Sequence, residues 1–365
     1  MTTARAPIPY SPSVERQEPD EQQTTDELVA ALRSISETTF ADYKHAVRSV
    51  HAKGHGIIHG TLEVLPELPE NLAQGLFANP GTYDVAMRFS TTPGDIVDDK
   101  ISTPRGLAIK VIGVEGERLP GSEASSTQDF LMVNGPAFNA PTAKAFLKNM
   151  KLLAKTTDKA EGLKKVLSAA LRGAETIAEA FGTQSATLKA LGGHPLTSPL
   201  GETYFTQTPM RYGDYIAKLS LAPTSPGLLA MKEAPVDLAG KPFGLRESIS
   251  HFFSAQGGTW ALRVQLCSDL DKMPIEDSSV AWDETDSPYI PVATLNVGPQ
   301  ASWVKEHSEA IEDSLSFSPW HGISAHKPLG SIMRVRKAAY EMSAGFRSSH
   351  NKCPVREPHN IAAIS

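Results

Sequence analysis

The sequence predicts an α+β fold: an antiparallel sheet, open or closed into a barrel, with helices inserted into it and following it. Three observations support this class. Strand-like segments of modest length recur through most of the chain, an Ala-, Leu- and Lys-rich block over 142–192 has helical spacing, and a second helical stretch follows at 330–347. No internal repeat or shift in composition marks a second domain, so we expect a single domain over 25–355.

The chain begins with a polar segment. Residues 1–24 are rich in Pro, Glu and Gln and contain no apolar stretch of the kind that a secretory signal requires. We therefore expect a disordered arm on a cytoplasmic protein. Thr24 and Glu27 then form a T-x-x-E capping pattern, and apolar residues recur after it at helical spacing, which predicts a helix from this point.

Strand-like segments follow this first helix. Alternating or β-branched residues predict strands over 56–64, 83–91, 107–114 and 129–133. The block over 142–192 predicts two or three helices that interrupt the sheet, and its closing Gly pair is typical of a helix C-terminus. Strand-like composition returns over 203–221, 259–267 and 290–297, before the helix over 330–347 and a tail over 356–365.

Composition makes several function classes poor candidates. Among 365 residues, 35 Lys and Arg oppose 41 Asp and Glu, giving a formal charge of −6 and no basic excess for nucleic acid. No stretch approaches the roughly 20 apolar residues that a membrane helix needs. The two cysteines, Cys267 and Cys353, are far apart and indicate neither a disulfide framework nor a thiolate zinc site.

Histidines and basic residues gather in the segment RSVHAKGHGIIHG over 48–60. His51, His55 and His59 are four residues apart and would share one face of a helix, where they could ligate a metal, but three glycines oppose a helix here. The alternative is that they occupy a solvated turn and strand, which we favour for His55 and His59.

Two further segments place polar side chains on one face. In VAMRFSTTPGD, Arg88 and Ser90 alternate with apolar neighbours and share a strand face, where they meet either solvent or a ligand. In RVRKAAYEMSAGFR, Arg336, Tyr340 and Arg347 share a helical face. A guanidinium one turn from a phenol stabilises the phenolate, the form that ligates a metal, although a surface stripe is the alternative.

Together these segments resemble the haem catalases. VHAKG resembles the distal-histidine motif of that superfamily, RFST its distal-serine strand, TPRGLAIK a further strand, and R-x-x-x-Y with a later Arg its proximal-tyrosine helix. WDETDSPYIPVATLNVG and FSPW resemble the segments before that helix. The motifs occur in the family's order over about residues 35–350, and the chain is most similar to the compact catalase-related peroxidase branch.

The resemblance implies a catalase-like antiparallel β-barrel enclosing a haem, of type haem b, with inserted and C-terminal helices. His51 would be the distal acid–base, Ser90 its orienting hydroxyl and Tyr340 the axial iron ligand, kept ionised by Arg336. The remaining haem contacts implied are Arg48, Arg88 and Arg347 at the propionates, Val50 over the distal face and Phe138 near the haem edge.

The sequence departs from the family at the distal asparagine. The family segment resembles NNTP-x-FF, whereas this chain has SSTQDFL. Ser126 is the nearest positional match and could donate one hydrogen bond; Asn134 lies further along the strand. Loss of such a preorganised contact costs about 10²-fold in rate, so the balance between dismutation and peroxidation stays open.

The function implied is breakdown of hydrogen peroxide by catalase or peroxidase chemistry through an oxoferryl intermediate, with a small organic electron donor in the second case. Two alternatives remain: a related enzyme acting on organic or fatty-acid hydroperoxides, and a non-catalytic haem-binding protein. The family also implies a homodimer or homotetramer, and the sequence gives no clear signature for NADPH.

Overall fold

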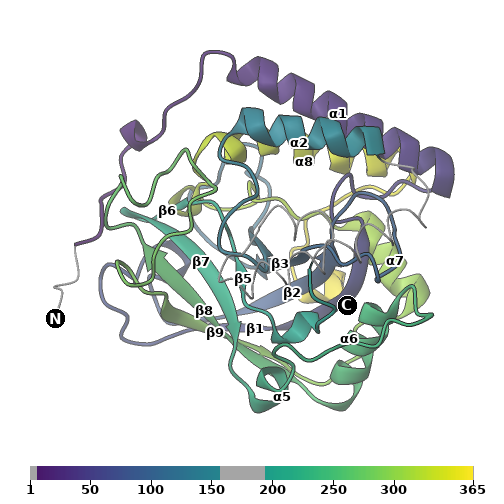
Figure 1. The fold of residues 1–365 in the computed structure, drawn as a ribbon. Helices are drawn as coiled ribbons and strands as arrows, with labels where there is room; N and C mark the ends of the chain where they lie inside the picture. Colours follow the sequence, from purple (N-terminus) through teal and green to yellow (C-terminus); the bar gives the residue numbers. More distant parts are fainter. Residues whose placement is uncertain (1–5, 157–193, 365) are drawn as a thin grey trace, which may run out of the picture.

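The computed structural model describes residues 6–156 and 194–364, and its centre is an antiparallel barrel (Figure 1). The strands follow the order β4, β3, β2, β1, β9, β8, β7, and β5 pairs with both β4 and β7, which closes an eight-strand ring. Short β6 pairs with β7 beside the ring. The strands are β1 (Lys53–Val64), β2 (Thr82–Thr91), β3 (Arg105–Ile112), β4 (Thr127–Val133), β5 (Tyr204–Phe205), β6 (Met210–Tyr212), β7 (Tyr215–Pro223), β8 (Gly258–Leu266) and β9 (Ile290–Val297).

Apolar side chains fill the barrel. Because strand side chains alternate between the two faces, each strand sends every second residue inward. Val85, Met87 and Phe89 of β2 thus join one buried cluster with inward residues of the other strands, such as Ile109 and Leu262. A large cofactor therefore could not lie within the barrel, and Arg88 and Ser90 point to its outer side.

Three helices form a layer along one side of the barrel. These are α1 (Glu21–Tyr43), α2 (Ala143–Thr156) and α8 (Ser331–His350), which pack on one another (Figure 1). Apolar residues of all three make a second core, separate from the barrel interior. The other helices are α5 (Pro226–Leu229), α6 (Gly244–Ala255) and α7 (Lys305–Ser314), with 3₁₀ turns at Pro12–Val14, Gly75–Phe77, Pro199–Gly201, Ser324–His326 and Ile361–Ala363.

The fold class and the predicted strands are confirmed, with small shifts at their ends. The segment 203–221 divides into β5, β6 and β7 because turns interrupt it. The final predicted helix corresponds to α8 and the first part of the 142–192 block to α2, while the rest of that block lies outside the described residues. Helices α6 and α7 were not predicted from the sequence.

The N-terminal segment differs from expectation. Helix α1 begins at Glu21, so Thr24 lies inside its first turns and donates its hydroxyl to the carbonyl of Asp20 instead of capping the helix. Residues 6–20 contact the rest of the fold, since the amide of Ile8 donates to the carbonyl of Cys267 and Glu15 forms ion pairs with Lys327 and Arg334. Ion pairs thus fix a segment whose composition is typical of disorder.

None of the helices in the described ranges combines the length and the apolar character that crossing a bilayer requires.

Candidate functional site

His51 lies in the loop before β1 with a strained backbone. Its φ of 52° is in the left-handed region, which costs free energy for a residue other than glycine and is often found at functional sites. Arg88 holds this conformation, because its Nη2 donates to the carbonyls of His51 at 3.0 Å and Ala52 at 3.3 Å. Strand β2 therefore fixes the loop that presents His51.

The imidazole of His51 is oriented by its neighbours on the outer face of the barrel. Nδ1 lies 3.2 Å from Oγ of Ser90. The ring also passes directly over Gly106, where a Cβ would overlap both the ring and the Ser90 hydroxyl. Glycine at position 106 is thus required for the close approach of this histidine to β3.

Burial makes His51 a neutral base. It lowers the pKa of His51 to about 3, and the nearby charges of Arg88 and Arg336 act in the same direction. Near neutral pH the ring therefore has one nitrogen free to accept a proton, as a general base must.

Helix α8 brings Tyr340 to the same region. Arg336 lies one turn before it, and its Nη2 donates to the Tyr340 Oη at 2.6 Å. The amide of Ser49 donates to Oγ of Ser343, three residues after Tyr340, at 3.3 Å, so the loop carrying His51 touches this helix. The charge of Arg336 also lowers the pKa of His51, so Arg336 and His51 lie within range of each other's charge.

Val50 and Phe138 lie beside α8. Both pack against the second core, whose members include Val335 and Ala339 of α8. The guanidinium of Arg336 lies 5.9 Å from the centre of the Phe138 ring. The structure thus brings both predicted apolar contacts to the helix that carries Tyr340.

The three remaining arginines meet at the C-terminal end of α7. Arg48 and Arg88 both donate to the carboxylate of Glu312, Arg88 from Nε at 2.8 Å. Arg347 donates to the carbonyl of Glu312 at 2.6 Å, and both Arg48 and Arg347 donate to the carbonyl of Leu315. The carbonyls at a helix C-terminus carry partial negative charge, so this end of α7 attracts cations.

Positive charge is in excess in this cluster. Burial and the neighbouring charge of Arg88 lower the pKa of Arg48 well below its usual value, although Glu312 opposes the shift. Within the described residues, Nε of Arg347 is buried and has no hydrogen-bond partner. Two guanidiniums thus share one carboxylate, the third is held by backbone carbonyls, and its buried Nε donor has no acceptor. This combination is typical of an anion site.

Ser126 is not brought to His51. Strands β3 and β4 pair from Gly106 with Val133 to Ile112 with Thr127, and Ser126 precedes Thr127. Six residues of strand separate it from the end where His51 lies, roughly 20 Å. Asn134 lies at the nearer end, but its side chain accepts from the amide of Arg105 at 2.9 Å and contacts Nε2 of His194 at 2.5 Å.

The histidines of the first segment do not converge as a metal site. His55 and His59 lie four residues apart on extended β1, which separates them by roughly 13 Å. His55 is fully buried rather than solvated, with Nε2 2.9 Å from the Thr91 hydroxyl. Its position at the bulge of β1 explains why the alternating pattern of the sequence did not indicate its burial.

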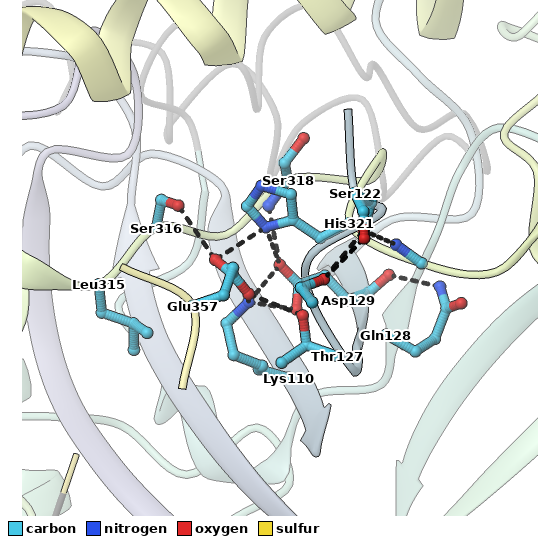
Figure 2. A network of polar contacts seen from close by, with 12 residues as sticks. Lys110, Ser122, Thr127, Gln128, Asp129, Leu315, Ser316, Ser318, His321 and Glu357 are labelled. Atoms are coloured by element: carbon cyan, nitrogen blue, oxygen red, sulfur yellow. Dashed lines mark hydrogen bonds and ion pairs between the residues drawn. The ribbon is translucent and has the colours of Figure 1, made fainter. Parts of the chain in front are cut away.

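A second polar network lies further along the same outer face of β3 and β4 (Figure 2). Nζ of Lys110 donates to Asp129 at 2.7 Å and to Glu357 at 2.6 Å, and Nδ1 of His321 lies 3.1 Å from each carboxylate. Thr127 also donates to Glu357. The carboxylates of Asp129 and Glu357 and the imidazole of His321 are close enough to one another to bind a metal. Lys110, however, is fully buried and already supplies their cation, so we interpret the network as a structural ion cluster.

Comparison with known proteins identifies the fold. No protein-family model matches the chain, and neither does any curated protein. Among solved structures, catalase A from Saccharomyces cerevisiae matches with a TM-score of 0.58 and 14% identity, over 88% of this chain and 65% of that one. A fungal catalase matches with 0.58 and 15%, over 87% and 63%, and a bacterial catalase with 0.58 and 16%, over 98% and 67%. The chain has a catalase-like fold.

The catalase-like fold extends over nearly the whole chain, which spans less than two-thirds of the length of the first two of these catalases. Identity at this level speaks for the architecture alone. Sequence reasoning had missed Glu312, which is one of several acidic residues over 305–313 and has no motif around it. It had also missed Ser343, whose contact with Ser49 only the packing of the loop on α8 creates.

Proposed function

We propose that this chain binds haem on the outer face of the barrel, against α8, and uses it to break down hydrogen peroxide. The observation that carries the proposal is the meeting of three elements in one region: neutral His51 with Ser90, the Arg336–Tyr340 pair, and an arginine cluster with excess positive charge. These are the groups that would serve as proton carrier, axial ligand and propionate partners. The catalase-like fold supports the same assignment.

The residues present fit such a cofactor. The buried and unpartnered Nε of Arg347 is suited to a carboxylate oxygen, and so are the guanidiniums of Arg48 and Arg88. Tyr340 Oη accepts from Arg336, so a charged donor already orients the oxygen that would ligate iron. Val50 and Phe138 would supply the apolar contacts.

When bound, haem supplies the redox-active iron at which peroxide is cleaved. His51 would accept the proton from one oxygen of peroxide and return it to the other, which makes water the leaving group. Ser90 engages Nδ1 of the ring and so leaves Nε2 for this transfer. Arg88 keeps the loop in place, since it holds the carbonyl of His51.

A second candidate is a peroxidase or an enzyme acting on organic hydroperoxides. The positions of Ser126 and Asn134 favour this candidate. Ser126 lies at the end of β4 away from His51, and the side chain of Asn134 already contacts the amide of Arg105 and the ring of His194. A pocket without a distal amide is expected to hold hydrogen peroxide less firmly for dismutation. Both candidates use His51 and Tyr340 in the same roles.

The test begins with a haem titration followed by Soret absorbance. We expect the purified chain to bind one haem, and Tyr340→Phe to change the spectrum while Tyr83→Phe, on β2 away from α8, leaves it unchanged. Absence of a Soret band in the unmodified chain would overturn haem binding, and an unchanged Tyr340→Phe spectrum would overturn the ligand. Dioxygen release from hydrogen peroxide then decides for catalase. Donor or organic hydroperoxide consumption without dioxygen decides for the second candidate, and His51→Ala should abolish either.

A further inference from the structure

Glu312 lies at the centre of the arginine cluster. It belongs to the last turn of α7, where a carboxylate faces the negative end of the helix dipole and would by itself be unfavourable. Arg48 and Arg88 hold it from two sides. The backbone of β1 also leaves room for it, because a Cβ on Gly54 would overlap the Glu312 carboxylate. Three elements of the fold are therefore shaped around this one side chain.

We propose that Glu312 is the built-in counter-anion of the cluster formed by Arg48, Arg88 and Arg347, and that it positions His51 through Arg88. This role belongs to the proposed haem site, and it rests on the proposed function only for the part that concerns the propionates of haem. Glu312 is a positioning residue, since it contacts the arginines and not the reacting atoms.

The link to His51 runs through a single guanidinium. Nε of Arg88 donates to both carboxylate oxygens of Glu312, at 2.8 and 3.0 Å, while its Nη2 donates to the carbonyls of His51 and Ala52. Because a guanidinium is planar, fixing one edge fixes the other. The carboxylate thus sets the direction of the donor that holds the left-handed backbone of His51.

The charges explain why a protein carboxylate is needed there. Arg48, Arg88 and Arg347 carry three positive charges, which the Glu312 carboxylate and, at Arg347, the nearby charge of Asp313 balance only in part. Propionate groups would complete this balance. Without Glu312, Arg48 and Arg88 of the haem-free chain would be largely buried cations that have lost their carboxylate partner, a costly arrangement. Burial raises the pKa of Glu312, but the charges of Arg48 and Arg88 outweigh it and lower the value to about 2, so the carboxylate stays ionised across the ordinary pH range.

The first experiment uses haem-free protein. Glu312→Ala removes the carboxylate and leaves space, Glu312→Gln removes the charge and keeps the shape, and Glu309→Ala, exposed on the same helix, is the control. Thermal unfolding is followed in sodium acetate and in sodium chloride of equal ionic strength. We expect both Glu312 variants to lose roughly 5–10 °C. Acetate should restore part of the loss in Glu312→Ala but not in Glu312→Gln, whose amide fills the space.

Losses no larger than that of Glu309→Ala, or equal effects of acetate and chloride on Glu312→Ala, would overturn the counter-anion role. If Glu312→Ala folds only in acetate, that dependence supports the role, and Glu312→Gln still tests it independently. The coupling to His51 is read from the ring proton signals of His51 in NMR spectra, identified with His51→Gln. They should shift in Glu312→Gln and not in Glu309→Ala, and identical spectra would overturn the positioning role.

Haem then tests the charge balance. Propionates would replace the missing anion, so Glu312→Gln should gain more thermal stability from haem than the unmodified chain does. An equal or smaller gain would contradict the counter-anion role. Failure of the unmodified chain to bind haem would instead overturn the proposed function, and the results on haem-free protein would stand.

Discussion

His51 should make the stability of the protein depend on pH. Its pKa is lowered from 6.5 to about 3 by burial and by the charges of Arg88 and Arg336, so the unfolded chain binds a proton here more readily than the folded one. The stabilisation is fully present above pH 6.5 and is lost as the pH falls toward 3. Each pH unit in this window corresponds to about 1.4 kcal/mol.

Replacing His51 with Gln removes this dependence. Between pH 6.0 and 4.5 the free energy of unfolding of the unmodified, haem-free chain should fall by about 2 kcal/mol more than that of His51→Gln. Urea unfolding at the two pH values measures both slopes. His251→Gln, at an exposed position of α6, is the matched control and should keep the full slope. Equal slopes for His51→Gln and the unmodified chain would show that His51 is not held neutral by its surroundings, and the case for it as a base would fail.

Three further predictions concern packing and the placement of Ser126. Gly106→Ala should lower the free energy of unfolding by about 1–3 kcal/mol, because the new methyl group overlaps the ring of His51. Urea unfolding measures this loss. A similar loss in Gly298→Ala, where a Cβ meets nothing within 4 Å, would refute the explanation. Ser126→Asn should leave dioxygen release unchanged, while Ser90→Ala should lower it; a rise in the first variant would place residue 126 near the reacting atoms after all. Lys110→Met should cost about 3–5 kcal/mol in urea unfolding, since two carboxylates lose their buried cation, and a loss below that of the surface variant Lys305→Met would contradict the structural importance of the network.

Local sequence patterns predicted most of the fold. Alternation is a property of a strand itself, so β2 could be located with Arg88 and Ser90 on one face and Phe89 on the other. Closure of the barrel could not be obtained in this way, because it depends on β5, a strand of only two residues, which pairs with both β4 and β7.

The candidate site was predictable only where spacing was informative. The pair of Arg336 and Tyr340 follows from helical geometry, and the structure joins them by a hydrogen bond. Ser126 was placed by matching a motif residue by residue, but an antiparallel ladder sends the start of β4 to the end of β3 that is far from Gly106. Glu312 required knowledge of which arginines converge, a long-range contact that no local pattern contains.

The division of β2 between two environments constrains how this protein can change. Odd positions, such as Met87, belong to the filled interior, and even positions, such as Arg88, belong to the candidate site. A mutational library restricted to the even positions would explore new chemistry on an unaltered frame. Insertion of a single residue within this strand would instead exchange the two sets, burying a guanidinium among apolar side chains and exposing phenylalanine at the site, so chemistry and folding would be lost in one step.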